Sequence, residues 1–357
     1  MSKGKLNKRV LLLLLVLIMT FTIAACGQTP IDTQEPSNNE EQIEENNSEI
    51  KELIVIDHLG REVKLEKPAE KIVSGYYITT SMLIALGLEE NVVGIEAKAD
   101  TRPIYKLAAR HFLDLPNVGT MKEFDLEGAA ALEPDLVILS IRLKDAAESL
   151  EQLGIKVLTV NPESMEELKE TIEMISKLTN TEDRAEELIK YYDDKTSELS
   201  AKIKDKEKKN VYLAGNSSLL STATMKMYQN SLIEMAGGEN VAGDIDDTYW
   251  AEISYEQLIV YNPDVIIGIP GAVYTKDEIL NDEKLQGINA VKNNKVYFMP
   301  DSFESWDSPV PSGILGTMWA TSLLNEDDYP FDVFKQDVYD FYKEFYDIEI
   351  NMEQITK

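Results

Sequence analysis

Two stretches of the chain repeat one pattern: residues 127–138 read EGAAALEPDLVI, and residues 256–267 read EQLIVYNPDVII. In each copy a Glu precedes a helical run, and Pro-Asp is followed by an unbroken apolar segment. Each copy therefore fits a helix that ends near Pro-Asp and leads into a buried strand. A short, continuous apolar run of this kind is typical of a parallel sheet that is covered on both faces.

A weaker repeat precedes each copy. Residues 86–95 read LGLEENVVGI and residues 236–244 read AGGENVAGD, so Glu-Asn-Val follows a Gly and a helical run in both places. Two matched landmarks in the same order predict two similar α/β lobes. Between them, apolar residues recur at helical spacing over residues 181–208, with one polar face. This segment predicts a single stiff helix, about 42 Å long, that joins the lobes.

The N-terminus has the order of a secretory signal peptide. A basic head at residues 3–9 precedes an apolar run at residues 10–25, and Cys26 follows directly. The run approaches the roughly 20 apolar residues that span a bilayer, so an uncleaved anchor is the alternative. The sequence IAAC resembles the bacterial lipobox, which implies that Cys26 becomes the lipidated first residue of the mature protein. We therefore expect an extracytoplasmic protein, anchored by lipid to the outer face of the cell membrane.

Composition narrows the class of protein. Cys26 is the only Cys, which excludes an internal disulfide. Residues 26–52 are rich in Asn, Gln, Glu and Pro, and such a segment cannot bury enough apolar surface to offset its ordering entropy. We predict a flexible acidic tether there. The formal net charge is −29 at pH 7, and a body this acidic is repelled by nucleic acid and by anionic lipid head groups.

Six stretches, in order along the chain, carry a specific resemblance. They are DHLGREVKLEKPAEKIVSG at 57–75, ALGLEENVVGI at 85–95, VGTMKEFDLEGAAALEPDLVI at 118–138, AGGENV at 236–241, ISYEQLIVYNPDVII at 253–267 and AVKNNKVYFMP at 290–300. Across residues 53–346 the chain resembles the bacterial ABC-transporter substrate-binding proteins for iron complexes, heme and cobalamin. That family also contains binders of metal oxyanions such as molybdate.

The resemblance implies an α/β fold of two Rossmann-like lobes joined by a single long backbone helix, with the ligand cleft between the lobes. It also implies that Glu127 and Glu256, which begin the two repeated phrases, meet basic residues on the membrane permease. The alternative for both is an ordinary exposed carboxylate at the start of a helix.

The predicted organisation follows from these patterns. It consists of a signal peptide at residues 1–25, a tether at 26–52, an N-terminal α/β lobe at 53–180, the linking helix at 181–208 and a C-terminal α/β lobe at 209–357. Apolar residues at helical intervals over residues 331–345 predict a last helix that packs onto the second lobe.

The ligand should lie where strands end and loops lead into helices. The first lobe's loops offer basic side chains, which hold anionic oxygens with charge-assisted hydrogen bonds. The second lobe's loops are richer in aromatic rings, which stack on a macrocycle or contact cationic groups. The candidate ligand contacts are Tyr76, Tyr77, Thr79, Lys98, Arg102, Lys122, Arg142, Tyr228, Trp250, Tyr274 and Trp306. Arg102 and Trp306 are the strongest single candidates, and a surface charge or a rim aromatic is the alternative for each residue.

We predict no resident metal, cofactor or catalytic residue. Neither His58, which is expected on the outside in the DHLGR turn, nor His111 has a partner at metal-ligand spacing. No G-x-S-x-G motif occurs, and no His lies near a plausible nucleophile. A surface adhesin or sensor and a hydrolase are the competing classes.

The predicted function is that of a monomeric receptor, which delivers a siderophore-type iron chelate to an ABC permease and its ATPase. Heme, cobalamin and an oxyanion such as molybdate are the alternative ligands. For heme, Met121, Tyr76 and Tyr77 are the candidate axial ligands.

Overall fold

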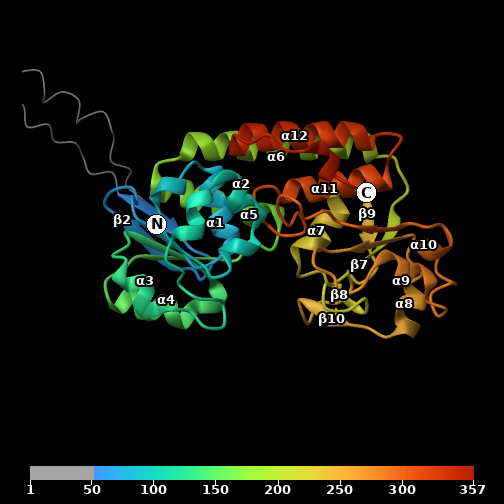
Figure 1. The fold of residues 1–357 in the computed structure, drawn as a ribbon, viewed down its shortest axis with the longest axis horizontal. Helices are drawn as coiled ribbons and strands as arrows, with labels where there is room; N and C mark the ends of the chain where they lie inside the picture. Colours follow the sequence, from blue (N-terminus) through green and yellow to red (C-terminus); the bar gives the residue numbers. More distant parts are fainter. Residues whose placement is uncertain (1–51) are drawn as a thin grey trace, which may run out of the picture. The chain divides into compact units, whose positions relative to one another are not determined.

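The computed structural model describes residues 52–357, which lie within one compact unit (Figure 1). The predicted signal peptide, the lipidation site Cys26 and the tether up to residue 51 lie outside the described residues. Among the helices of residues 52–357, none is long and apolar enough to cross a membrane.

The first lobe is built on a parallel four-stranded sheet with the strand order β4-β3-β5-β6. Its central strand β5 is the apolar run after the first Pro-Asp, and every residue of it is buried, as expected for a strand covered on both faces. A separate antiparallel hairpin, β1-β2, precedes the sheet. The strands are β1 (Leu53–Ile56), β2 (Glu62–Leu65), β3 (Ile72–Ser74), β4 (Val92–Ile95), β5 (Leu136–Ser140) and β6 (Val157–Val160); the helices are α1 (Tyr77–Ala85), α2 (Pro103–Ala108), α3 (Leu126–Ala131), α4 (Lys144–Gln152) and α5 (Met165–Thr179).

The second lobe repeats this arrangement. Strands β9, β7, β11 and β12 pair in parallel in that order, which matches β4-β3-β5-β6 strand for strand. Strands β8 and β10 add an antiparallel extension next to β7. The prediction of two similar lobes is thus confirmed. The strands are β7 (Lys209–Ala214), β8 (Ser221–Ala223), β9 (Gly238–Asn240), β10 (Trp250–Glu252), β11 (Val265–Gly268) and β12 (Val296–Phe298); the helices are α7 (Tyr228–Met235), α8 (Tyr255–Tyr261), α9 (Lys276–Asn281), α10 (Asn289–Lys292) and α11 (Gly313–Leu324).

The Asp of each Pro-Asp pair has the same structural role in both lobes. The Asp135 carboxylate accepts the backbone amides of Glu70 and Lys71, each at 3.0 Å, just before β3. The Asp264 carboxylate accepts the amide of Asn210, at 3.1 Å, at the start of β7. Each Asp therefore ties the beginning of its own strand to the beginning of the neighbouring strand, which explains why both copies retain it.

The linking helix α6 runs over Glu182–Ile203 and is shorter than the predicted segment 181–208. Residues 204–208 alternate Lys with Asp and Glu and are all exposed, so no apolar side chain there favours extending the helix. At 1.5 Å per residue the observed helix is about 33 Å long.

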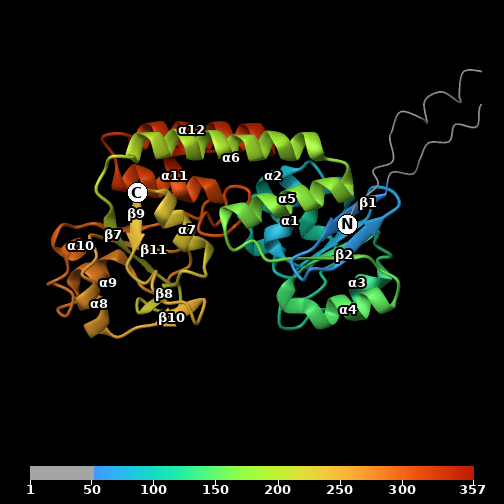
Figure 2. The same cartoon turned by 180° about the vertical axis from the view of Figure 1, so that it is seen from behind.

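The last helix, α12 (Phe331–Tyr346), lies beside α6 in both views (Figures 1 and 2). Lys195 of α6 pairs with Asp337 of α12 at 2.8 Å, and Arg184 donates to the Glu344 carbonyl at 2.7 Å. Helix α12 packs against α11 of the second lobe, so the prediction that it packs onto that lobe is confirmed, and it also contacts α1 of the first lobe. The covalent connection is the single helix α6, and α12 braces it by side-chain packing.

Phe341→Ala should lower the free energy of unfolding by about 3–5 kcal/mol, because truncating a buried aromatic residue leaves a cavity. Phe341 is fully buried, and its ring centroid lies 5.3 Å from that of Tyr191 on α6 and 5.0 Å from that of Phe345. Urea unfolding measures the change. Val333→Ala on the same helix is the control, since Val333 is 47% exposed and its loss should cost less than about 0.5 kcal/mol. Equal effects of the two substitutions would contradict the role of Phe341.

Candidate ligand cleft

A hollow of about 400 Å³ lies at the carboxyl ends of β3 and β4. After β3 the chain passes through Gly75 into Tyr76 and Tyr77, and after β4 it passes through Glu96 to Lys98. The residues that line the hollow are Gly75, Tyr76, Tyr77, Glu96, Ala97, Lys98, Arg102, Gly119, Thr120, Met121 and Lys122. The structure therefore brings together five of the predicted contacts, from three loops that are separate in the sequence: Tyr76, Tyr77, Lys98, Arg102 and Lys122.

The hollow is basic. Lys98 and Lys122 are exposed, and neither forms an ion pair within the described part of the chain. The Arg102 guanidinium lies 4.0 Å from the centroid of the Tyr77 ring. The backbone of Lys98 is left-handed, with φ 71°. This conformation is rare for residues other than Gly, Asn and Asp, and such residues cluster at functional sites.

Among the described residues that line the hollow, Glu96 carries the one carboxylate. Its oxygens already form hydrogen bonds within the protein. It accepts hydrogen bonds from the hydroxyls of Thr80, at 2.6 Å, and Tyr105, at 2.7 Å. Burial raises the pKa of Glu96 above its ordinary value. The free charges that face a ligand are therefore positive.

Residues of the second lobe meet the same region. The Arg142 guanidinium, after β5, lies 5.5 Å from the centroid of the Tyr249 ring and 3.9 Å from the Glu163 carboxylate. The Tyr77 hydroxyl donates to Ser308 Oγ at 3.0 Å. These contacts show that the two lobes approach each other beside the hollow.

Two other aromatic candidates of the second lobe are only half-buried. Trp250 packs over Gly215, where a Cβ atom would lie 3.0 Å from the indole ring. The Tyr274 hydroxyl donates to the Gly215 carbonyl at 2.7 Å. Both rings thus surround the loop that follows β7, at the carboxyl end of that strand. Whether they touch a ligand stays a prediction.

Three predicted contacts are buried in the protein itself. Thr79 is fully buried and donates to the Tyr76 carbonyl at 2.9 Å, and Tyr228 is 1% exposed at the start of α7. Trp306 is 1% exposed, and its indole donates to the Tyr342 hydroxyl at 2.9 Å. In this structure these side chains pack inside the protein. Whether they contact a ligand stays a prediction. The Pro-rich loop before α11 is held against α12, which sequence patterns did not reveal.

Sequence reasoning also missed a residue of this region. Glu163, which pairs with Arg142, lies three residues after the end of β6. Its position in the sequence could have identified it, because Glu163 lies in the loop after a strand of the first sheet, where ligand contacts are expected.

His58 also departs from its prediction. It is half-buried, and its Nδ1 accepts the Asn161 amide at 2.6 Å. It therefore fixes the N-terminal hairpin to the loop after β6 instead of lying free in solvent.

Asp307 is 6% exposed, and burial raises its pKa to about 6. Among residues 52–357 its one side-chain partner is Gln229, whose Nε2 donates to the carboxylate at 3.3 Å. Because the folded-state pKa lies above the unfolded value, the folded protein holds a proton that the unfolded chain has already lost. The free energy of unfolding should therefore fall as the pH rises from about 4 to about 6, and then level off.

Asp307→Asn should raise the free energy of unfolding at pH 7 by up to about 3 kcal/mol and change it little at pH 4. Burial raises the pKa of Glu96, Glu163 and Glu304 in the same direction, so only the difference between variant and parent isolates Asp307. Urea unfolding of both proteins at the two pH values measures it. A gain that is the same at pH 4 and pH 7 would show that Asp307 does not titrate in this range.

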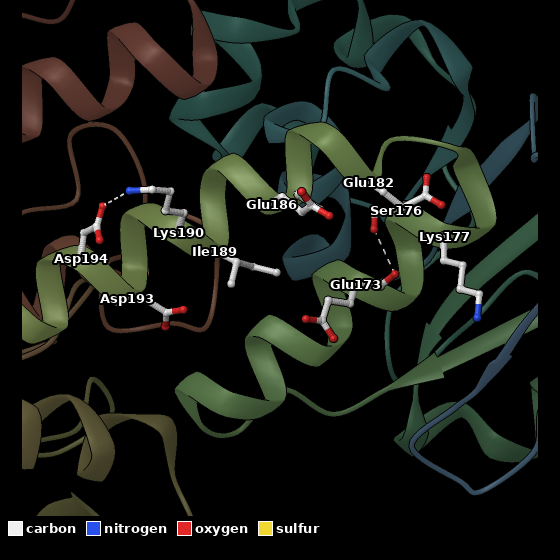
Figure 3. A pocket seen from close by; sticks show the side chains of 10 residues that line it. Glu173, Ser176, Lys177, Glu182, Glu186, Ile189, Lys190, Asp193 and Asp194 are labelled. Carbon is white, nitrogen blue, oxygen red and sulfur yellow. Dashed lines mark hydrogen bonds and ion pairs between the residues drawn. The ribbon is translucent and has the colours of Figure 1, made fainter.

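A second, larger groove lies between α5 and α6, with a volume of about 620 Å³ (Figure 3). It is lined by Glu173, Ser176, Lys177, Glu182, Ala185, Glu186, Ile189, Lys190, Asp193 and Asp194. Half of its lining residues are acidic, and it lies on helix surfaces instead of at strand ends. The hollow at β3 and β4 therefore remains the candidate ligand site.

The chain matches a known family of binding proteins. Residues 72–303 match the model of the periplasmic binding protein family, and this match covers parts of both lobes and the whole helix between them. This chain belongs to that family.

Relatives of this binding protein span most of its length. An ABC transporter substrate-binding lipoprotein of Bacillus subtilis, YvrC, is 28% identical over 294 residues, covering 79% of this chain and 87% of YvrC. The petrobactin-binding protein YclQ of Bacillus subtilis is 23% identical over 300 residues, covering 82% and 91%. The molybdate-bound structure of MolA from Haemophilus influenzae has a TM-score of 0.73 at 22% identity, covering 84% of this chain and 99% of MolA, and shows the shared fold.

The two Glu residues of the repeat occupy equivalent places in the binding protein. Glu127 and Glu256 are both exposed in the first turn of α3 and α8. Asp125 caps α3 by accepting the Gly128 amide at 2.8 Å, and Ser254 caps α8 by accepting the Gln257 amide at 3.1 Å. Both helices lie on the edge away from α6 and α12 in the two views (Figures 1 and 2).

The pKa of Glu256 is held below its ordinary value, first by its own backbone amide and then by the Ser254 hydroxyl. The side chain therefore carries a full negative charge at neutral pH. Contact of Glu127 and Glu256 with a permease stays a prediction.

Proposed function

We propose that this protein is a lipid-anchored, extracytoplasmic receptor that captures an anionic metal chelate of the siderophore type and delivers it to an ABC permease and its ATPase. Membership of the periplasmic binding protein family supports the receptor role, and nothing in that role requires catalysis. The predicted lipidation of Cys26 would hold the receptor at the membrane.

The observation that carries the proposed ligand class is the basic, aromatic-lined hollow at the carboxyl ends of β3 and β4. Lys98, Arg102 and Lys122 supply positive charge, and Tyr76 and Tyr77 supply ring faces. Its volume of about 400 Å³ lies within the roughly 300–1,000 Å³ typical of sites for organic ligands. An anionic chelate matches both the charge and the size.

A bare oxyanion is the second candidate, because one relative, MolA, is a molybdate-binding protein at 24% identity over 330 residues. A tetrahedral anion would need only the basic side chains and would leave much of the hollow to water. Heme and cobalamin are further candidates, and Met121 lines the hollow where an axial heme ligand could lie.

Trp fluorescence of a soluble form that starts at Gly27 tests the ligand class. Trp250 is the half-buried reporter, since Trp306 and Trp319 are fully buried. The protein is titrated in parallel with a ferric siderophore, heme, cobalamin and molybdate. Saturable quenching by the siderophore at micromolar concentration or below, confirmed by calorimetry, is expected. A response to only one of the other three compounds would show that the ligand belongs to that compound's class instead. If the folded protein responds to none of the four, the proposed ligand class is wrong.

A further inference from the structure

The outward face of α8 combines a charge with exposed apolar side chains. Ile259 and Val260 lie three and four residues after Glu256, and side chains at these spacings share one face of a helix. Ile259 is 44% exposed and Val260 is 76% exposed, whereas Leu258 on the inner face is fully buried. The core of the second lobe therefore does not account for Ile259 and Val260.

The equivalent helix of the first lobe lacks these side chains. In the repeat, Glu127 corresponds to Glu256, while Ala130 and Ala131 stand where α8 has Ile259 and Val260. Both lobes keep the exposed carboxylate, but only the second lobe adds an apolar patch beside it. Helices α3 and α8 therefore carry chemically different side chains at equivalent positions.

The surroundings of the patch indicate the charge of its partner. Val260 lines a groove of about 560 Å³, and Glu234, Glu239 and Asp244 line the same groove. Together with Glu256, these carboxylates favour a basic partner and disfavour a second copy of this acidic chain. Apolar side chains within such a rim are the arrangement expected of a protein-binding surface.

We propose that the α8 face formed by Glu256, Ile259 and Val260 binds an apolar depression rimmed by basic residues on the permease, and that its absence from α3 fixes which half of the permease each lobe meets. This inference rests on the proposed receptor function. It adds an apolar contact and a fixed orientation to the predicted contacts of Glu127 and Glu256.

The test measures binding of the full-length receptor to its permease–ATPase complex in nanodiscs by biolayer interferometry. Ile259→Ala/Val260→Ala should weaken binding about tenfold to a hundredfold, because the variant removes apolar area that the complex buries. Val333→Ala on α12 is the matched control, since it removes an exposed Val far from α8 and should leave binding unchanged. Thermal unfolding of each variant verifies that it is folded.

A transfer variant tests the orientation. Ala131→Val/Val260→Ala moves one apolar side chain from the second lobe to the first, and it should bind as weakly as Val260→Ala alone. Recovery of parental affinity would overturn the fixed orientation.

The outcomes also separate this inference from the proposed function. Parental binding by Ile259→Ala/Val260→Ala, with loss of binding by Glu127→Ala/Glu256→Ala, would overturn the apolar contact and leave the receptor function standing. Parental binding by both double variants would remove the docking role of this edge altogether.

Discussion

Glu127→Ala/Glu256→Ala should abolish ligand uptake by cells while leaving ligand affinity unchanged. Both side chains are exposed at the starts of α3 and α8, where they support no buried structure. Their loss should therefore spare the fold and the hollow at β3 and β4. If they are the charges that meet a basic permease surface, the receptor would still fill with ligand but would no longer deliver it.

Uptake of radiolabelled ligand by cells that carry each variant measures this effect, with calorimetry on the purified proteins for affinity. Glu186→Ala/Asp194→Ala is the matched control, because it removes two exposed carboxylates from α6, on the opposite edge. Normal uptake by the Glu127→Ala/Glu256→Ala variant would remove the docking role of these residues. A parallel loss of ligand affinity would mean instead that the substitutions disturb the cleft.

Lys98→Ala/Lys122→Ala should weaken ligand binding by about a hundredfold to ten-thousandfold. Each Lys lines the hollow without an internal ion-pair partner in the described chain, so its charge is free for the ligand. A hydrogen bond to a charged group contributes about 1.5–3 kcal/mol, and two of them account for the expected range. Because both side chains are exposed, the free energy of unfolding should change by less than about 0.5 kcal/mol.

Calorimetric titration with the compound that the fluorescence screen selects measures this loss. Lys144→Ala/Lys156→Ala serves as the control, since it removes the same charge from exposed positions outside the hollow. The affinity should also fall with added salt in the parent and less so in the Lys98→Ala/Lys122→Ala variant. Equal affinities of the two double variants would mean that the ligand does not use the charges of the hollow.

Several features of the protein follow from local patterns in its amino-acid sequence. The repeated Pro-Asp phrases predicted two similar lobes, and their strands β5 and β11 occupy the same place in two sheets of the same order. The charged residues after strand ends predicted the basic loops, and Lys98, Arg102 and Lys122 do meet at one hollow. These predictions succeeded because they depend on local order, in which strand, loop and helix follow one another along the chain.

The failures concern contacts between distant parts of the chain. The sequence around Trp306 predicted an aromatic side chain exposed on a loop, but in the structure Trp306 packs against Tyr342 and Phe334. The pattern at residues 331–346 correctly predicted packing onto the second lobe, but it did not reveal that the helix also lies along α6 and reaches the first lobe. An amphipathic pattern predicts that a helix has an apolar face, but it does not predict which surface of the protein that face will pack against.

The sequence by itself thus determined the class of fold, its internal duplication and the chemistry of the loops, because residue type and spacing suffice for these. Only the tertiary structure decided which loop residues line the hollow, which of them are buried, and that Ile259 and Val260 of α8 are exposed. Burial depends on partners that are far away in sequence, and it is burial that separates a side chain that supports the site from one that faces the ligand.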